Sequence, residues 1–121
     1  MDALTPLTPE AAERFMARLP YEQRFHVSIV GKHGGFQSVP ILSAEEFVKV
    51  TAALRPVFAS EVLGRWVAER LGDGELGEAV RTACEEVPVF MQAAPAYELM
   101  SARLDEARAV LGVEQQVAVE A

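Results

Sequence analysis

The chain has 121 residues, of which 50% are hydrophobic, and its formal net charge is −7. A chain of this length forms a single domain around one hydrophobic core. Residues 1–42 carry equal numbers of acidic and basic side chains, so the whole excess of negative charge falls on residues 43–121. Because phosphate backbones are bound by clustered cations, we expect no nucleic-acid partner.

No stretch approaches the roughly 18 consecutive apolar residues of a membrane helix, so we expect no membrane partner either. The opening residues lack the basic start and apolar centre of a signal peptide. Cys84 is the only cysteine, which excludes an internal disulfide and fits a reducing compartment. These features together predict a cytoplasmic protein.

The first segments are predicted to be a loose arm over residues 1–7 and a helix over residues 8–19. Thr8 can cap this helix with its hydroxyl group. Pro9 suits the first turn, because the N–H that it lacks would have no helical partner there. Pro20 is expected to end the helix.

Residues 24–42 predict a β-hairpin. Apolar residues alternate with polar ones along its first half, so that Phe25 and Val27 share one face while His26 lies on the other. Pro40 cannot donate to a strand ladder, which places the second strand at a sheet edge. Two strands alone are marginally stable. The hairpin must therefore pack on helices or pair with a second copy of itself.

The loop that joins the two strands, Gly31–Gly35, contains three glycines. Such turns can point successive N–H groups at an anion, and Lys32 would add positive charge. The loop is not a Walker A motif, because the lysine is followed by a histidine and a strand. A plain hairpin turn is the favoured interpretation. The alternative is a ligand-binding loop, whose candidate residues are Lys32, His33, Gly34 and Gly35.

Residues 43–112 are predicted to form the helical part of the domain. Ser43 and Glu46 form a capping box that opens a helix ending near Leu54. Asp73 is expected to cap a helix over residues 74–87. The apolar face of that helix carries small side chains, so another helix can approach it closely.

The central element is a helix predicted within the stretch 55–72, around which the others pack. Pro56 fits its first turn, and Gly72 fits the position just after its end. Apolar residues recur every four positions along one face of this helix, at Phe58, Val62 and Trp66. We interpret Trp66 as a core residue, with an exposed binding aromatic as the alternative.

The stretch from Pro88 to Pro95 breaks the helices with apolar residues, including Phe90 and Met91. Connecting segments normally lie at the surface, so these side chains need a cover. We expect other parts of the same chain to bury them, and a partner site is the alternative.

The last helix is predicted over residues 96–111, with Gly112 ending it and residues 113–121 forming a frayed tail. Apolar side chains follow a heptad spacing along this helix, at Tyr97, Met100, Leu104, Ala107 and Leu111. Two heptads are too few to establish a coiled coil. The seam is interpreted as ordinary core packing, with a dimer contact as the alternative.

The residues that could carry catalysis or bind a metal form no recognisable arrangement. The two histidines lie seven positions apart, too far to share a metal along an extended strand, and zinc needs three or four ligands. Cys84 precedes two glutamates, which would raise its pKa, and its place on an apolar stripe predicts an inert buried thiol. We predict no catalytic residue, no metal site and no cofactor.

The sequence therefore predicts an α+β, mainly α domain: an N-terminal helix, one β-hairpin and about four helices packed around a central helix. The predicted function is protein–protein interaction through buried apolar surface, within a homodimer or with another protein. The candidate interface residues are Phe90, Met91, Tyr97, Met100, Leu104 and Leu111. The alternative is a small-molecule or anion sensor that uses the Gly31–Gly35 loop or a pocket between the helices and the hairpin.

Overall fold

The computed structural model describes residues 4–30 and 34–120, the last eight of them by their backbone only. Within these ranges the chain is mainly helical with one antiparallel hairpin, which confirms the predicted α+β, mainly α class. The elements in chain order are α1 (Pro9–Met16), η1 (Tyr21–Gln23), β1 (Phe25–Val30), β2 (Phe36–Ile41), α2 (Ala44–Leu54), α3 (Ser60–Glu69), α4 (Gly74–Glu85), η2 (Val89–Met91) and α5 (Ala93–Glu120). The two η elements are single 3₁₀ turns.

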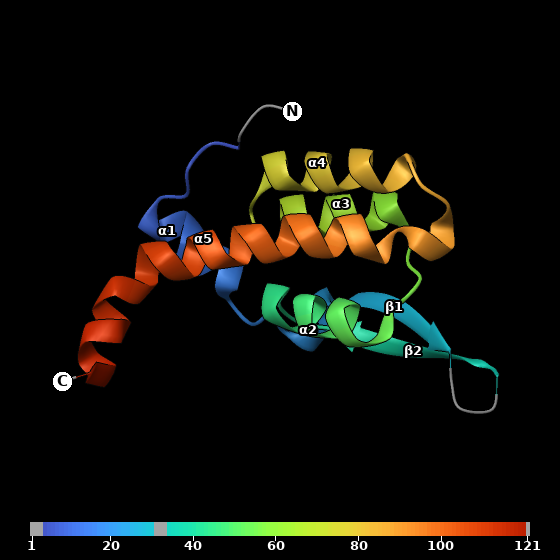
Figure 1. Cartoon of the computed structure of the whole chain (residues 1–121), viewed down its shortest axis with the longest axis horizontal. Coiled ribbons are helices and arrows are strands. Elements are labelled where there is room, and N and C mark those ends of the chain that lie inside the picture. The colour runs from blue at the N-terminus through green and yellow to red at the C-terminus, as the bar shows by residue number, and fades with distance from the viewer. Residues whose placement is uncertain (1–3, 31–33, 121) are drawn as a thin grey trace.

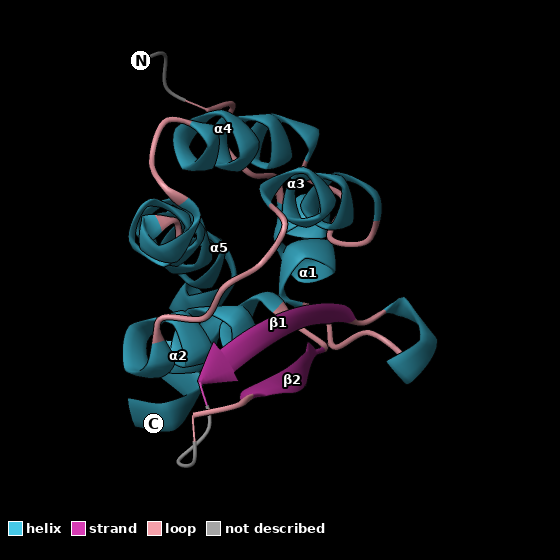
Figure 2. Ribbon diagram, turned by 90° about the vertical axis from the view of Figure 1, so that its right-hand side faces the viewer, coloured by secondary structure: helices cyan, strands magenta, loops and turns pink. Residues whose placement is uncertain are grey.

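The long helix α5 runs across the middle of the molecule (Figure 1). The pair α3 and α4 lies on one side of it, and α2 lies with the hairpin on the other (Figures 1 and 2). Helix α5 contacts α1, α2 and α4, whereas α3 packs mainly against α4. The element that joins most of the others is therefore α5, and not the helix that the sequence predicted to be central.

The core centres on four aromatic rings that come from four different segments. The ring centroids of Phe25 and Trp66 are 5.5 Å apart, and those of Phe47 and Phe58 are 5.7 Å apart. Trp66 is only 6% exposed, and its indole N–H donates to the carbonyl oxygen of Gln23 at 2.8 Å. The interpretation of Trp66 as a core residue is confirmed.

The helix start predicted at Pro56 is wrong. Residues 56–59 are not helical, and Val57 exchanges two backbone hydrogen bonds of 2.8 Å with Ser28 on the edge of β1 that does not face β2. This pairing holds the segment out of the helix, so α3 begins only at Ser60. Val62 is 46% exposed, although the sequence placed it on the buried face.

The three predicted helix starts with capping side chains are confirmed. Thr8 accepts from the N–H of Ala11, Ser43 from that of Glu46 and Asp73 from that of Leu76, each at 3.1 Å. These caps satisfy N–H groups that the first helical turn leaves without a partner.

Several predicted helix ends are wrong. Helix α1 ends at Met16 and α4 at Glu85, both earlier than expected. Helix α5 begins at Ala93 and continues through Gly112 to Glu120 instead of leaving a frayed tail. A glycine inside a helix costs about 1 kcal/mol relative to alanine, which is too little to end a helix in a stretch of helix-compatible residues.

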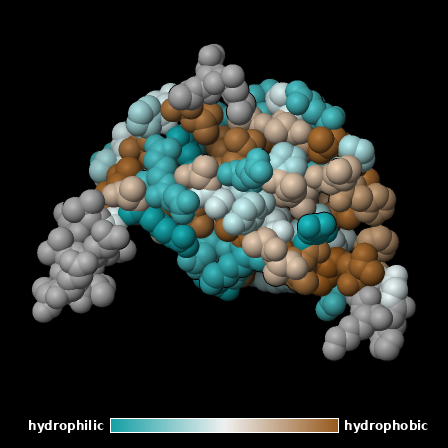
Figure 3. Space-filling view, in the orientation of Figure 1, coloured by the Kyte–Doolittle hydropathy of each residue, from teal (hydrophilic) through white to brown (hydrophobic). Residues whose placement is uncertain are grey.

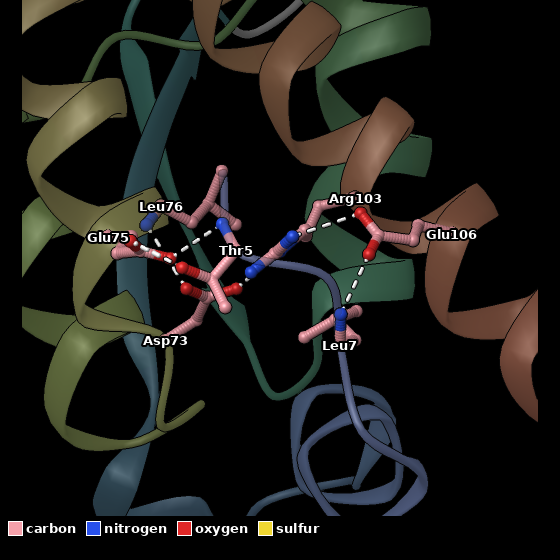
Figure 4. Close-up of polar contacts among 7 residues, drawn as sticks. All are labelled: Thr5, Leu7, Asp73, Glu75, Leu76, Arg103 and Glu106. Atoms are coloured by element: carbon pink, nitrogen blue, oxygen red, sulfur yellow. Dashed lines mark hydrogen bonds and ion pairs between the residues drawn. The ribbon is translucent and has the colours of Figure 1, made fainter. Parts of the chain in front are cut away.

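Residues 4–7 are not a loose arm. The backbone N–H and the hydroxyl of Thr5 donate to the two carboxylate oxygens of Glu75, each at 2.9 Å. The N–H of Leu7 donates to a carboxylate oxygen of Glu106 at 2.8 Å (Figure 4). The arm is therefore tied to both α4 and α5 by carboxylates.

The same carboxylates lie beside a buried ion pair between α4 and α5 (Figure 4). The Nε of Arg103 donates to Asp73 at 2.7 Å, and the two side chains are 4% and 7% exposed. Burial alone would lower the pKa of Arg103, but hydrogen bonds and opposite charges from Asp73 and Glu106 raise it above its usual value. Arg103 therefore stays charged and links the cap of α4 to the middle of α5.

In the part of the chain that the structure describes, no helix combines the length and the apolar character that crossing a bilayer requires.

Candidate functional site

A groove of about 460 Å³ lies between the C-terminal end of α2 and the start of α5. The two helices run in opposite directions, so the end of one meets the beginning of the other (Figure 1). We call this recess the α2–α5 groove. It is lined by Thr51, Ala52, Arg55, Phe90, Met91, Ala93, Ala94 and Tyr97.

Small and large side chains divide the α2–α5 groove into different parts. Ala52, Ala93 and Ala94 contribute only a methyl group each, so no long side chain from these positions fills the space between the two helices. Phe90 and Met91 stand beside them on the 3₁₀ turn η2 and are 69% and 62% exposed. The groove is therefore a small-residue recess flanked by large apolar side chains.

The exposure of Phe90 and Met91 overturns the prediction that the chain itself buries this turn. The inward position of the turn is taken by Gln92, which is 9% exposed. The side-chain amide of Gln92 donates to the backbone carbonyl of Val87 at 3.3 Å. The backbone carbonyl of Gln92 accepts from the thiol of Cys84 at 3.5 Å. Because a polar residue fills the space under the turn, the apolar residues before it face solvent.

Arg55 brings the positive charge to the α2–α5 groove. Its side chain is exposed, and among the described residues its guanidinium has no ion-pair or hydrogen-bonding partner. Its backbone adopts the left-handed conformation at φ 47°, where it closes α2. This conformation costs a non-glycine residue roughly 1–2 kcal/mol, so the chain keeps a cation at a position where glycine would be easier to accommodate.

The hydroxyl group of Thr51 does not add a free polar group to the groove. It donates within its own helix to the carbonyl of Phe47 at 2.8 Å. The side chains that line the recess are therefore mostly apolar, with the Arg55 guanidinium and the Tyr97 hydroxyl as the polar groups at hand.

The loop that the sequence predicted to bind an anion is only partly described. Lys32 and His33 lie outside the described residues. Gly34 and Gly35 are exposed, with no atom near the position where a side chain would begin, and Gly34 has a φ of 88° that suits glycine. This geometry fits a hairpin turn, and the proposed anion site stays a prediction.

The heptad seam of the last helix packs inside its own chain. Met100 and Leu104 are 0% and 1% exposed, and α5 contacts α1, α2 and α4 along its length. These two residues therefore belong to the core and offer no free surface to a partner, which corrects their assignment as interface residues. Tyr97 and Leu111 are half-buried, and only Tyr97 lines the groove.

Cys84 is fully buried, and its burial, followed by the charge of Glu85, raises the pKa of the thiol to about 11. The predicted burial of the thiol is confirmed, and its inertness stays a prediction. His26 lies on the exposed face of β1, as expected, where its ring bonds to Arg24 at 2.8 Å and to Ser38 at 3.0 Å. Within the described ranges, no three His, Cys, Asp or Glu side chains gather closely enough to hold a metal ion.

Sequence reasoning found Phe90, Met91 and Tyr97 but missed the rest of the groove. Ala52 and Ala94 carry no sequence signal of their own, because a small residue on a helix is ordinary. Arg55 carried none either, because the residue before a proline is expected in the extended region and not in the left-handed conformation that the structure shows.

Apolar surface gathers at one end of the molecule, on the right in Figure 3. It extends over the region where η2 leads into α5 and down toward the hairpin (Figures 1 and 3). Monomeric proteins seldom expose large contiguous apolar areas unless they are used in binding.

Comparison of the chain with protein families, with curated proteins and with solved structures found no match in any of the three.

Proposed function

We propose that the protein acts through protein–protein contact and binds an apolar segment of a partner in the α2–α5 groove. The observation that carries this proposal is the exposure of Phe90 and Met91, at 69% and 62%, beside a recess of about 460 Å³. A surface that covered these two side chains would be stabilised, since burial contributes about 25 cal/mol per Å² of apolar area.

The composition of the groove supports a protein partner. Phenylalanine, tyrosine, methionine and arginine are enriched at the centres of interfaces, and each of them lines this recess. Arginine and tyrosine are also common among the residues that dominate binding energy. The shallow alanine positions leave space for side chains of a partner helix or extended segment.

The charge of the groove defines the partner further. Arg55 stands at the recess without a carboxylate partner among the described residues, in a chain whose net charge is −7. The start of α5 adds the positive end of the helix dipole. The segment that fits is therefore apolar with one acidic residue at its edge.

The test is a selection from a library of short amphipathic peptides, half of which carry one acidic residue. Peptides selected on the wild-type chain should bind at least tenfold more weakly to Phe90→Asp, because the substitution puts a charge where apolar surface should be buried. Val62→Asp is the matched control, since Val62 is also an exposed apolar residue but lies on α3, outside the groove. Equal binding to the wild type and Phe90→Asp would remove the proposal.

Arg55→Ala tests the charge separately. It should weaken the peptides that carry an acidic residue by about tenfold, equivalent to about 1.4 kcal/mol, and leave uncharged peptides unaffected. If both peptide classes lose the same affinity, Arg55 contributes packing and not charge recognition.

The volume of the groove favours a second candidate function, the sensing of a small molecule. Ligand sites typically measure about 300–1,000 Å³ and combine apolar walls with few polar groups. The fitting ligand would be an apolar compound with one carboxylate. A thermal shift of the wild type with medium-chain fatty acids that is lost in Phe90→Asp would support this function, and no shift in the wild type would contradict it.

A further inference from the structure

One edge of the hairpin is left without a backbone partner in the described structure. Strand β1 has a neighbour on both sides, because β2 pairs along one edge and Val57 bonds to Ser28 on the other. Strand β2 lies at the outside of the sheet (Figure 2). From Phe36 to Ser38 it is exposed, and Pro40 is exposed as well.

The register decides which backbone groups of β2 point outward. In an antiparallel pair, hydrogen-bonded and non-hydrogen-bonded residue pairs alternate. The N–H and C=O of Ser28 are both hydrogen-bonded to Val57 and therefore point away from β2. The pair of Ser28 with Ser38 is thus a non-hydrogen-bonded one. The pair of His26 with Pro40 has the same parity, which agrees with the missing N–H of proline. The backbone groups of Phe36, Ser38 and Pro40 therefore face away from β1.

This outward edge is complementary to itself. We propose that β2 pairs antiparallel with β2 of a second copy about a two-fold axis at Ser38, which joins two hairpins into one four-stranded sheet. Ser38 then exchanges both backbone hydrogen bonds with its counterpart. The N–H of Phe36 donates to the C=O of Pro40 in the other copy, and the reverse bond completes a set of four. Proline removes only the two donors at the ends of the set.

The side chains favour a second copy over another protein. Strand β2 reads FQSVPI and carries no charge, in a chain of net charge −7. Edge strands that must stay unpaired usually carry charges, lysine in particular. In the antiparallel arrangement Phe36, which is 64% exposed, faces Pro40 of the other copy, and this contact forms twice. A symmetric dimer needs such a self-complementary patch.

The experiment measures the mass of the full-length chain by sedimentation velocity and native mass spectrometry over a wide concentration range. Ser38→Lys places two like charges opposite each other at the two-fold axis and should raise the dimer dissociation constant at least tenfold. Ser38→Pro removes the outward N–H of Ser38 and leaves the ladder to β1 unchanged. Circular dichroism establishes that each variant is folded.

Two controls keep the result specific to the strand edge. Ser38→Ala removes the hydroxyl that contacts His26 but keeps the backbone groups, so it should dimerise like the wild type. Gln37→Lys adds the same charge as Ser38→Lys on the neighbouring residue, away from the axis, and should have the smaller effect. If the Ser38→Pro variant fails to fold, the dimerisation of the Ser38→Lys variant alone tests the proposal.

The inference uses none of the residues that line the α2–α5 groove, so it stands or falls independently of the proposed function. The proposal is overturned if the wild-type chain stays monomeric up to high micromolar concentration. This also holds if a strand of another protein pairs with the edge of β2. A dimer that persists in the folded Ser38→Lys variant overturns it as well, because the interface then lies elsewhere.

Discussion

Gly64 of α3 and Gly77 of α4 lie with their backbones in contact. A Cβ atom on Gly64 would stand 2.8 Å from the carbonyl oxygen of Gly77, and one on Gly77 would collide with the carbonyl oxygen of Gly64. The sequence predicted that another helix could approach α4 closely through its small apolar side chains; α3 does approach closely, but the contact is made at Gly77. The two glycines set the distance at which α3 and α4 pack.

Gly77→Ala should therefore destabilise the protein by about 1–3 kcal/mol, the usual cost of overpacking a core. The added methyl group meets backbone, which cannot rotate away as a side chain can. Urea unfolding followed by circular dichroism measures the effect. Gly74→Ala is the control, because nothing lies within 4 Å of its Cβ position, and it should leave the stability equal or slightly higher. Similar losses in both variants would contradict the explanation.

Asp73→Asn should cost about 3 kcal/mol of the free energy of unfolding. Asparagine still caps α4, but the substitution leaves Arg103 buried with only Glu106 to balance its charge, and breaking a buried pair is expensive. The measurement is again urea unfolding. Asp105→Asn makes the same chemical change on the exposed face of α5, where its 3.9 Å contact with Arg108 should contribute little. If the two variants are equally stable, the Asp73–Arg103 pair does not hold α4 to α5.

Cys84 predicts a loss of stability at alkaline pH. Its pKa is raised from 9.0 to about 11 in the folded chain, so the folded state holds the thiol proton more tightly than the unfolded state does. The resulting stabilisation is complete below pH 9 and disappears as the pH rises toward about 11. Unfolding midpoints measured across this range should fall more steeply for the wild type than for Cys84→Ala. Parallel curves would show that other groups cause the alkaline loss.

Two substitutions at Arg55 separate backbone strain from ligand recognition. Arg55→Ala keeps a non-glycine residue in the left-handed conformation, whereas Arg55→Gly relieves the strain. The glycine variant should be the more stable of the two by up to about 1 kcal/mol, since part of the relief is offset by the entropy of glycine in the unfolded chain. Both lack the guanidinium and should bind acidic peptides equally weakly. Thermal unfolding and peptide titration together provide the measurements.

Local signals in the sequence were sufficient for the helix starts. Thr8, Ser43 and Asp73 each cap the helix that follows them, because a capping bond spans only three residues and depends on nothing distant. The alternation along β1 likewise predicted the hairpin and its buried face. Secondary-structure elements that are determined by contacts within a few residues could therefore be predicted from the sequence.

Features that depend on distant residues were not. Pro56 begins no helix because its neighbour Val57 pairs with Ser28, nearly thirty positions away. The exposure of Phe90 depends on Gln92 filling the inside of its turn, which composition alone cannot indicate. The α2–α5 groove is lined by Ala52 from α2 and Ala94 from α5. Nothing in the sequence around either residue indicates that the two lie close together.

The contact between Leu7 and Glu106, at 2.8 Å, joins residues 99 positions apart, which bears on how the chain folds. Helix α1 packs mainly against α5 and makes only a few contacts with α2, so most of its cover comes from a segment far along the chain. Contacts between segments so far apart in sequence form late and slowly. Phe15 and Ala12, both fully buried in the finished fold, are therefore expected to become covered late in folding.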